Sequence, residues 1–141
     1  MSHLLDANVW LALAFESHRH HAAARRWFER STDEQCLFCR VTQQGFLRIA
    51  TNRRAFGYEA LSPRAAWSVY DRLIGDPRVL YSDEPRGLES LWRTHTGSEN
   101  QSPSGWTDAY LFSFAAAGGF ALVTFDQGMR RYAGADLVLL A

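Results

Sequence analysis

Short apolar segments alternate with helix-like segments along nearly the whole chain, and this alternation constrains the fold more than any other feature. The segments with the length and composition of buried strands are residues 4–5, 36–41, 78–81, 120–124 and 137–140. Strands that alternate with helices form βαβ units, which build a mostly parallel sheet. The sequence therefore predicts an α/β fold.

The helical segments are set apart by capping and helix-stopping residues. Ser62 and Pro63 form a strong helix start, because a capping hydroxyl precedes a proline at the first helical position. Thr42 is the expected N-cap of a helix over residues 43–51. Other helices are expected over 9–15, from Ser17 or His18, over 85–93 and from Thr107-Asp108 to Gly118-Gly119, with a helical turn over 128–131 and the longest loop over 94–105.

Length and composition indicate one globular domain over residues 1–141. With 141 residues, of which 47% are hydrophobic and 21% charged, the chain can bury a substantial core. No apolar run reaches the roughly 18 residues of a membrane span. The first residues lack a cationic region, and Asp6 and Asn8 interrupt the first apolar stretch, so no signal peptide is expected. We therefore expect a cytoplasmic protein without a membrane-bound part.

The charged residues exclude several classes of site. The formal net charge is zero, which does not favour a purely electrostatic nucleic-acid binder. All 15 basic residues are arginine, and the absence of lysine excludes Schiff-base lysines and the lysine of a P-loop.

The two cysteines, Cys36 and Cys39, are separated by two residues, as in redox motifs or half of a zinc site. If both lie on one strand, their side chains point to opposite faces of the sheet. We therefore interpret them as buried structural thiols, with a zinc or redox site as the alternative.

Three aspartates occur in equivalent places of the strand–helix alternation. Asp6 follows the first strand, Asp108 stands at a helix start, and Asp126 follows the strand over 120–124. Strand ends and helix starts share one edge of a parallel sheet, where ligands bind. Each aspartate, and Asn8, could instead cap a helix or a turn. Three such positions favour a convergent acidic site.

Carboxylates that converge repel one another unless a cation lies between them. Mg²⁺ or Mn²⁺ prefers such oxygen ligands and completes its coordination with water. A metal of this kind activates water and stabilises a phosphoryl transition state. The pattern therefore indicates metal-dependent hydrolysis of a phosphodiester.

Four collinear segments contain the candidate site residues: residues 4–12 with Asp6 and Asn8, residues 41–48 followed by Thr51 and Asn52, residues 106–111 with Asp108, and residues 122–126 with Asp126. Together with His18 and His21 before the alanine-rich second helix, these segments resemble the PIN-domain ribonucleases, and most closely the VapC toxins of toxin–antitoxin pairs. The resemblance covers nearly the whole chain. It implies a PIN-like three-layer α/β/α fold with a mostly parallel central sheet of four to five strands.

The resemblance also implies an activity and a set of site residues. The activity is that of a Mg²⁺-dependent endoribonuclease, with Mn²⁺ as a possible metal. Asp6, Asp108 and Asp126 fall on the family's catalytic and metal-binding positions, and Asn8 and Thr124 on its supporting polar positions. Proteins of this type cleave RNA, are typically homodimers, and are neutralised by a VapB-type antitoxin.

One position departs from the family pattern. Gln43, or Gln44 if the register shifts by one, stands where the family commonly has a glutamate. An amide can offer a carbonyl oxygen to a metal but brings no charge. We therefore expect a weaker metal site. The alternative function is a PIN-fold module with lost catalysis that binds RNA or an antitoxin.

Other polar and aromatic residues have two interpretations each. Arg48, Arg53 and Arg54 could contact RNA phosphates, although a solvated charged surface is the commoner role. The histidines at 18, 20 and 21 are expected to cap or pack, and tryptophans such as Trp10 and Trp27 to lie in the core or a dimer interface. A haloacid-dehalogenase-like phosphatase is remote, because position 8 is Asn and lysine is absent.

Overall fold

The computed structural model describes residues 1–97 and 102–141, and a five-stranded parallel sheet lies at its centre. The strands are β1 (Ser2–Leu5), β2 (Gln35–Phe38), β3 (Val79–Tyr81), β4 (Ala121–Thr124) and β5 (Leu137–Leu139). Their order is β3-β2-β1-β4-β5, and every neighbouring pair is parallel. The predicted α/β sheet is confirmed. Because β1 lies in the middle, the residue after it faces the centre of the sheet edge.

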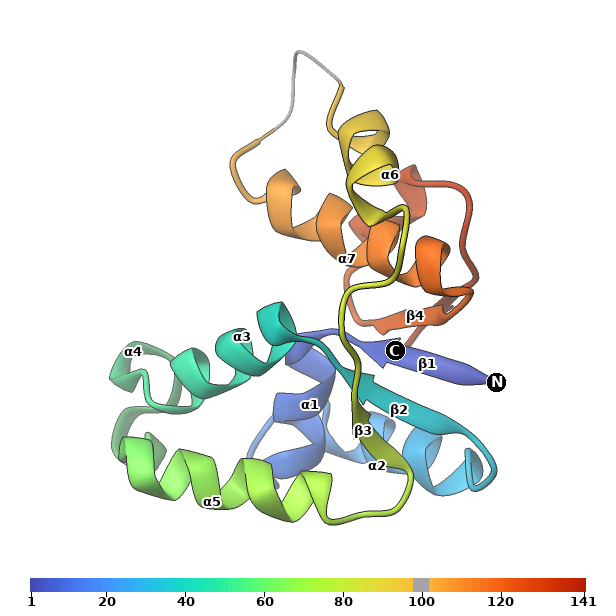
Figure 1. Cartoon of the computed structure of the whole chain (residues 1–141). Coiled ribbons are helices and arrows are strands. Elements are labelled where there is room, and N and C mark those ends of the chain that lie inside the picture. Colours follow the sequence, from blue (N-terminus) through green and yellow to red (C-terminus); the bar gives the residue numbers. More distant parts are fainter. Residues whose placement is uncertain (98–101) are drawn as a thin grey trace.

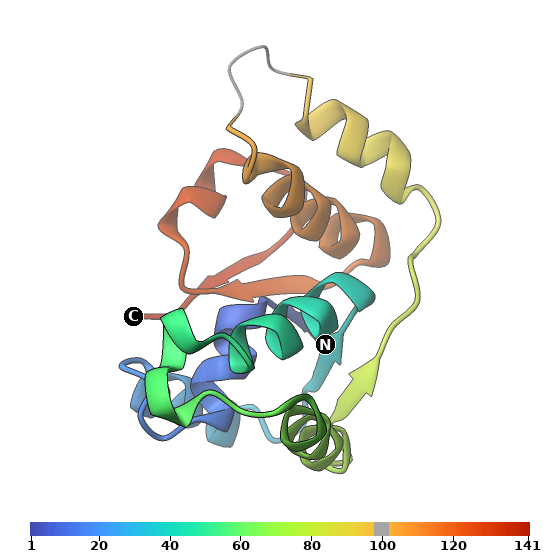
Figure 2. The same cartoon turned by 90° about the vertical axis from the view of Figure 1, so that its left-hand side faces the viewer.

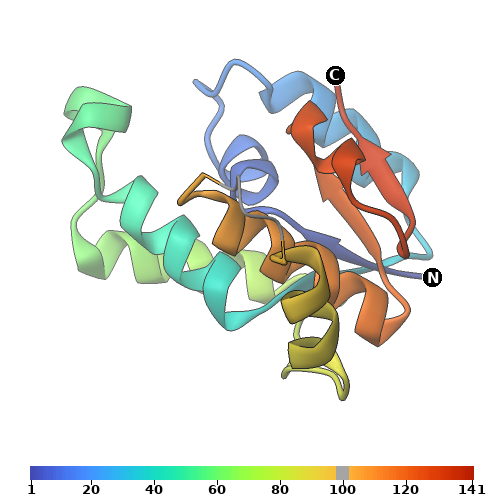
Figure 3. The same ribbon diagram turned by 90° about the horizontal axis from the view of Figure 1, so that it is seen from above.

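Helices cover both faces of the sheet and make a three-layer molecule (Figure 1). The helices are α1 (Ala7–Ala14), α2 (His21–Arg30), α3 (Arg40–Ala50), α4 (Arg53–Phe56), α5 (Pro63–Ile74), α6 (Leu88–His95) and α7 (Gly105–Gly118), with 3₁₀ turns η1 (Gly57–Glu59) and η2 (Gln127–Arg131). In Figure 2, α6 and α7 lie above the sheet, while α1, α3 and α5 lie below it. From above, α1 lies between α2 on one side and α3 and α5 on the other (Figure 3).

Alternation along the strands divides the core between the two faces. Leu5 packs in a cluster with residues of α1, α2, α3 and α5, while its neighbour Leu4 packs against α6 and α7. Cys36 and Cys39 lie in these two different clusters, and both are free and buried. Burial raises the pKa of the Cys36 thiol to about 12. The interpretation of both cysteines as buried structural thiols is therefore confirmed.

Several predicted helix starts were wrong, and local hydrogen bonds explain the differences. The strand β2 ends at Phe38, and α3 begins at Arg40 with Cys39 as its N-cap. Thr42 is the third helical residue, and its hydroxyl accepts a hydrogen bond from the Cys39 backbone N–H at 2.9 Å. This is one half of a capping box, so Thr42 caps from inside the helix.

The second helix also begins later than expected. It begins at His21, and residues 16–20 form turns in which the His18 N–H donates to the Phe15 carbonyl. These turns leave residues 18–20 free to face the edge of the sheet.

Two predicted helix boundaries are confirmed. The Ser62 hydroxyl accepts a hydrogen bond from the Ala65 N–H at 3.1 Å at the start of α5. Gly119 ends α7 with a φ of 69°, a left-handed conformation that glycine adopts without strain.

The predicted loop over residues 94–105 is shorter than expected. The helix α6, which begins at Leu88, continues to His95, and α7 already begins at Gly105. Residues 98–101 of that prediction lie outside the described residues. Of the helices described, none combines the length and apolar character needed to cross a bilayer.

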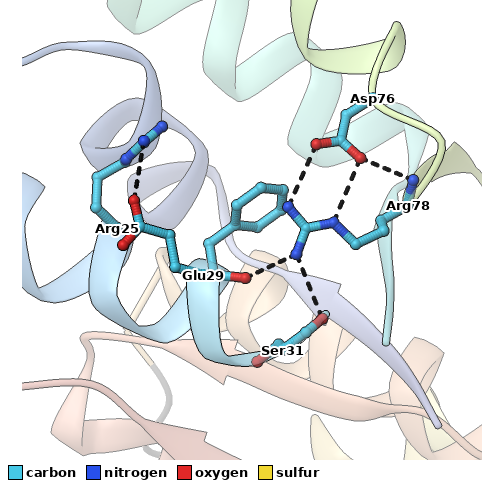
Figure 4. Close-up of polar contacts among 6 residues, drawn as sticks. Arg25, Glu29, Ser31, Asp76 and Arg78 are labelled. Atoms are coloured by element: carbon cyan, nitrogen blue, oxygen red, sulfur yellow. Dashed lines mark hydrogen bonds and ion pairs between the residues drawn. The ribbon is translucent and has the colours of Figure 1, made fainter. Parts of the chain in front are cut away.

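Arg78 joins the end of α2 to the start of β3 (Figure 4). Its guanidinium donates hydrogen bonds to the backbone carbonyls of Phe28, at 2.8 Å, and Ser31, at 3.4 Å, and pairs with Asp76 at 3.3 Å. These carbonyls stand at the C-terminal end of a helix, where a cation is favoured. Arg78 therefore stabilises the junction between two elements that are distant in sequence.

Candidate active site

The three predicted aspartates line one cleft at the carboxyl edge of the sheet. The cleft has a volume of about 480 Å³ and is lined by Asp6, Asn8, His18, Arg19, His20, Asp108, Phe125 and Asp126. Asp6 follows β1 directly, and Asp126 follows the neighbouring strand β4 after one residue. Asp108 lies in the first turn of α7. The tertiary structure thus brings together residues that are separated by 120 positions at most.

Asp6 occupies the N-cap position of α1, but its side chain makes no capping hydrogen bond. Instead, its Oδ2 accepts a hydrogen bond from the Thr124 hydroxyl at 2.8 Å. Burial raises the pKa of Asp6, and the charges of Asp108 and Asp126 raise it further, although the Thr124 hydrogen bond acts in the opposite direction. An ionised Asp6 is therefore unfavourable here without a nearby cation.

Thr124 links two of the aspartates. It is completely buried, and its hydroxyl oxygen accepts a hydrogen bond from the Asp126 backbone N–H at 3.0 Å while donating to Asp6. A hydroxyl can donate one hydrogen bond and accept another at the same time. Among small side chains, only threonine and serine could therefore make both contacts. Thr124 thus fixes the relative positions of Asp6 and Asp126.

Asp126 caps a turn, which is the alternative to a ligand role that the sequence analysis left open. Its Oδ1 accepts a hydrogen bond from the Gly128 N–H at 2.8 Å, as in an Asx turn. A Cβ atom added to Gly128 would lie 3.0 Å from this oxygen and 2.9 Å from Arg131, so only glycine fits without displacement. The turn holds one carboxylate oxygen of Asp126 and leaves the other side of the group toward the cleft available.

Asp108 pairs with Arg131, which follows the same turn. Arg131 donates from Nη2 to Asp108 Oδ2 at 3.0 Å and from Nη1 to the Gly128 carbonyl at 2.6 Å. Its guanidinium also lies 4.5 Å from the centre of the Tyr132 ring, a cation–π distance. The last residue of β4 and the segment after it therefore hold one oxygen of each of the three aspartates, through Thr124, Gly128 and Arg131.

The donor set fits a hard divalent cation. Asp6, Asp108 and Asp126 supply carboxylate oxygens, and Asn8 adds a side-chain carbonyl at the same cleft. Within residues 1–97 and 102–141, no three His, Cys, Asp or Glu side chains are already gathered closely enough to hold a metal. Water ligands would complete the shell, as is usual for Mg²⁺. The three carboxylates that line this one cleft are the observation that favours a cation at this place.

The structure does not bring Gln43 to these aspartates. Its side chain is only 7% exposed, and its Oε1 accepts a hydrogen bond from Arg40 Nη1 at 2.5 Å, on the side of α3 that faces Tyr70. Gly45 is the α3 residue beside the start of α1, since its added Cβ would lie 3.2 Å from Ala7 Cβ. Gln44 is exposed and does not line the cleft either.

The predicted RNA-contacting arginines also lie outside the acidic cleft. Arg48 borders a different cleft between α3 and α5, and Arg53 and Arg54 are exposed on α4. Sequence reasoning missed Arg19 and Arg131, which do reach the site. Two features of the sequence could have indicated them. Arg19 lies between His18 and His20, and Arg131 lies five residues after Asp126.

Comparison with known proteins agrees with the fold. Residues 3–135 match the PIN domain family. Over 98% of both chains, the sequence is 45% identical to Ribonuclease VapC41 of Mycobacterium tuberculosis. Among solved structures, VapBC2 of Rickettsia felis, bound to a DNA fragment from its promoter, has a TM-score of 0.71 at 13% identity and covers 100% of both chains. VapC20 of M. tuberculosis, a Sarcin-Ricin loop cleaving toxin, has a TM-score of 0.65 at 16% identity over 92% of this chain and 93% of that chain.

The match to the family over most of the chain settles the class of protein. The chain belongs to the PIN-domain family, and within it to the VapC group of ribonucleases.

Proposed function

We propose that this protein is a metal-dependent endoribonuclease that hydrolyses RNA phosphodiester bonds, and that it acts as the toxin of a toxin–antitoxin pair. The observation that supports this most is the cleft lined by Asp6, Asp108 and Asp126, each with one oxygen held by the end of β4 or by the segment after it. The names of the relatives, among them Ribonuclease VapC41, support the substrate class.

In this proposal Asp6, Asp108 and Asp126 hold Mg²⁺, or Mn²⁺, with Asn8 as a supporting ligand. A bound metal of this kind supplies an activated water and stabilises the charge that develops on the phosphate. The residues of the chain orient the site: Thr124 fixes Asp6 against Asp126, and Arg131 fixes Asp108. Arg131 also offsets one negative charge of the cleft.

The toxin role brings two partners into the proposal. VapBC2 and FitAcB of Neisseria gonorrhoeae, which share the fold, are antitoxin–toxin complexes. We propose that a VapB-type antitoxin neutralises this chain and that the chain forms a homodimer.

Cleavage of a labelled RNA tests the activity directly. We expect cleavage with Mg²⁺, none with EDTA, and a loss of about 10²-fold or more in Asp6→Asn, since a ligand that also neutralises charge is removed. Asp71→Asn is the control, because Asp71 is exposed on α5, away from the cleft. On expression, Asp6→Asn should relieve growth arrest and Asp71→Asn should not. Undiminished cleavage by a folded Asp6→Asn protein would contradict the mechanism.

The alternative, a PIN-fold module without catalysis, rests on the missing acidic residue of α3. Gln43 lies outside the cleft, so Gln43→Glu is expected to add no ligand. If the wild type fails to cleave RNA while Gln43→Glu cleaves it, the binding module is the better description.

A further inference from the structure

A second cleft adjoins the acidic one and shares three of its residues. It has a volume of about 420 Å³, within the range of roughly 300–1,000 Å³ typical of small-ligand sites. Asn8, His18 and Arg19 line both clefts. The two clefts therefore adjoin at these residues, and together they extend from the aspartates past α1 toward α4. We call this the α1–α4 groove.

The second cleft combines an apolar floor with a polar rim. Leu11, Ile49 and Phe56 are its large apolar residues, and they are partly or fully buried. Ser17 and Glu59 form part of the rim, where the Ser17 hydroxyl donates to a Glu59 carboxylate oxygen at 2.5 Å. A nucleobase likewise combines apolar and polar parts, because its faces are apolar and stack while its edges form hydrogen bonds.

Arg19 stands at the junction of the two clefts and is held there by its neighbours. Its Nε donates a hydrogen bond to His20 Nε2 at 3.1 Å. The His20 ring stacks on Phe125, with ring centres 4.4 Å apart and planes inclined by 17°. Phe125 directly precedes Asp126, so the loop that bears Arg19 is attached to the same segment that holds the aspartates.

A guanidinium beside three carboxylates is well placed for a phosphate group. Arginine binds phosphate with two parallel hydrogen bonds, and the one Arg19 makes to His20 uses Nε and leaves the terminal nitrogens for such a contact. A strand whose cleaved phosphate lies at the aspartates would carry its next phosphate and base along the groove. Arg53 and Arg54 precede Ala55, which lines the far end of the second cleft.

We propose that the α1–α4 groove binds single-stranded RNA, with Arg19 contacting a backbone phosphate and the second cleft receiving the base of a nucleotide next to the cleaved bond. The proposal rests on the proposed function, since it takes the aspartates as the place of cleavage. It assigns to Arg19 and to the second cleft a role in substrate binding, separate from the chemistry at the aspartates.

The test measures binding apart from cleavage. Asp6→Asn, in which cleavage is expected to be lost, serves as the background, and binding of a short fluorescent single-stranded RNA is followed by anisotropy at several salt concentrations. Adding Arg19→Gln should weaken binding by about five- to tenfold. It should also reduce by about one the slope of the logarithm of the binding constant against the logarithm of the salt concentration. Arg25→Gln is the control, because Arg25 is exposed on α2, pairs with Glu29 and lines neither cleft.

A second variant fills the cleft without removing a charge. Ala55→Trp should weaken RNA binding and change the preferred cleavage site when introduced into the otherwise wild-type enzyme. Ala22→Trp is its control, since Ala22 is an exposed helical alanine that lines neither cleft.

The outcomes separate this proposal from the proposed function. If the wild type does not cleave RNA but Arg19→Gln and Ala55→Trp weaken binding as expected, the groove is supported and the activity is refuted. If the wild type cleaves RNA and both variants bind and cleave like their controls, the groove is refuted and the activity stands. If Ala55→Trp leaves RNA binding intact but prevents neutralisation by the antitoxin, the groove is a protein interface, and the proposal is overturned.

Discussion

At the scale of single residues, Thr124 shows how one buried hydroxyl determines the geometry of the site. It is the only residue described that bonds to two of the three aspartates, through the Asp6 carboxylate and the Asp126 N–H. An N–H or carboxylate that loses such a partner in a buried place remains unsatisfied, which costs free energy. The hydroxyl therefore contributes both to stability and to the arrangement of the aspartates.

Thr124→Val tests this role, because valine keeps the shape and removes the hydroxyl. We expect the free energy of unfolding to fall by about 1–3 kcal/mol, as measured by urea denaturation. RNA cleavage should fall by about 10–100-fold, the usual effect of losing a residue that orients a metal ligand. Thr124→Ser retains the hydroxyl and should restore most of the activity; an equal loss in both variants would show that packing alone matters.

The raised pKa of Asp6 predicts a pH dependence of stability. Burial, followed by the charges of Asp108 and Asp126, makes the folded protein hold the Asp6 proton more tightly than the unfolded chain does. The stability from the protonated group is fully present below the ordinary carboxyl pKa and is lost as the pH rises through the raised pKa.

Asp6→Asn should therefore unfold at a higher temperature than the wild type in EDTA at neutral pH, and the difference should shrink on acidification. Mg²⁺ should raise the unfolding temperature of the wild type and change that of Asp6→Asn much less. Thermal unfolding followed by circular dichroism from pH 4 to 8 provides the measurement. A wild type that is more stable than Asp6→Asn at neutral pH without metal would contradict the assigned origin of the shift.

At the scale of secondary-structure elements, Arg78 connects α2 to β3, and Figure 4 shows it beside a simpler ion pair. Arg78 satisfies two backbone carbonyls and Asp76, and its guanidinium lies 3.7 Å from the centre of the Phe28 ring. Burial alone would raise the pKa of Asp76, but the hydrogen bonds and charge of Arg78 lower it overall. Arg25 pairs with Glu29, one turn away on the same helix.

Arg78→Ala should lower the free energy of unfolding by about 1–3 kcal/mol, because charge-assisted hydrogen bonds and carbonyl partners are lost. Arg25→Ala should change it by about 0.5 kcal/mol or less, as expected for an exposed pair within a helix. Chemical denaturation of the two variants and the wild type compares them directly. Equal effects would show that Arg78 acts only as a surface charge.

Elements also show where local sequence signals fail. The start of α5 was predicted correctly, since Ser62 and Pro63 act within one turn of the chain. The start of α3 was predicted wrongly, because Cys39 has a weak intrinsic preference for the N-cap position. Its capping box depends on the Thr42 hydroxyl, which accepts a hydrogen bond from the backbone N–H of Cys39, three residues earlier. The prediction took the best capping residue as the cap, whereas the end of β2 determined where the helix could begin.

At the scale of the whole molecule, the sheet order determines which residues meet. β1 lies between β2 and β4, so Asp6 and Asp126 follow neighbouring strands although 120 positions separate them in the chain. The helix α7 packs across the opposite face from α3 and presents Asp108 at the same edge. The acidic cleft is thus a product of the parallel topology.

The sequence by itself determined the α/β class, the parallel sheet, most helix positions and the three aspartates, because strand and helix periodicity and strand-end carboxylates are local patterns. Only the tertiary structure decided how those carboxylates are held. Thr124 and Arg131 reach them through contacts between elements. The tertiary structure also left Gln43 outside the cleft and placed Arg19 beside it, since the position of a side chain depends on what its segment packs against.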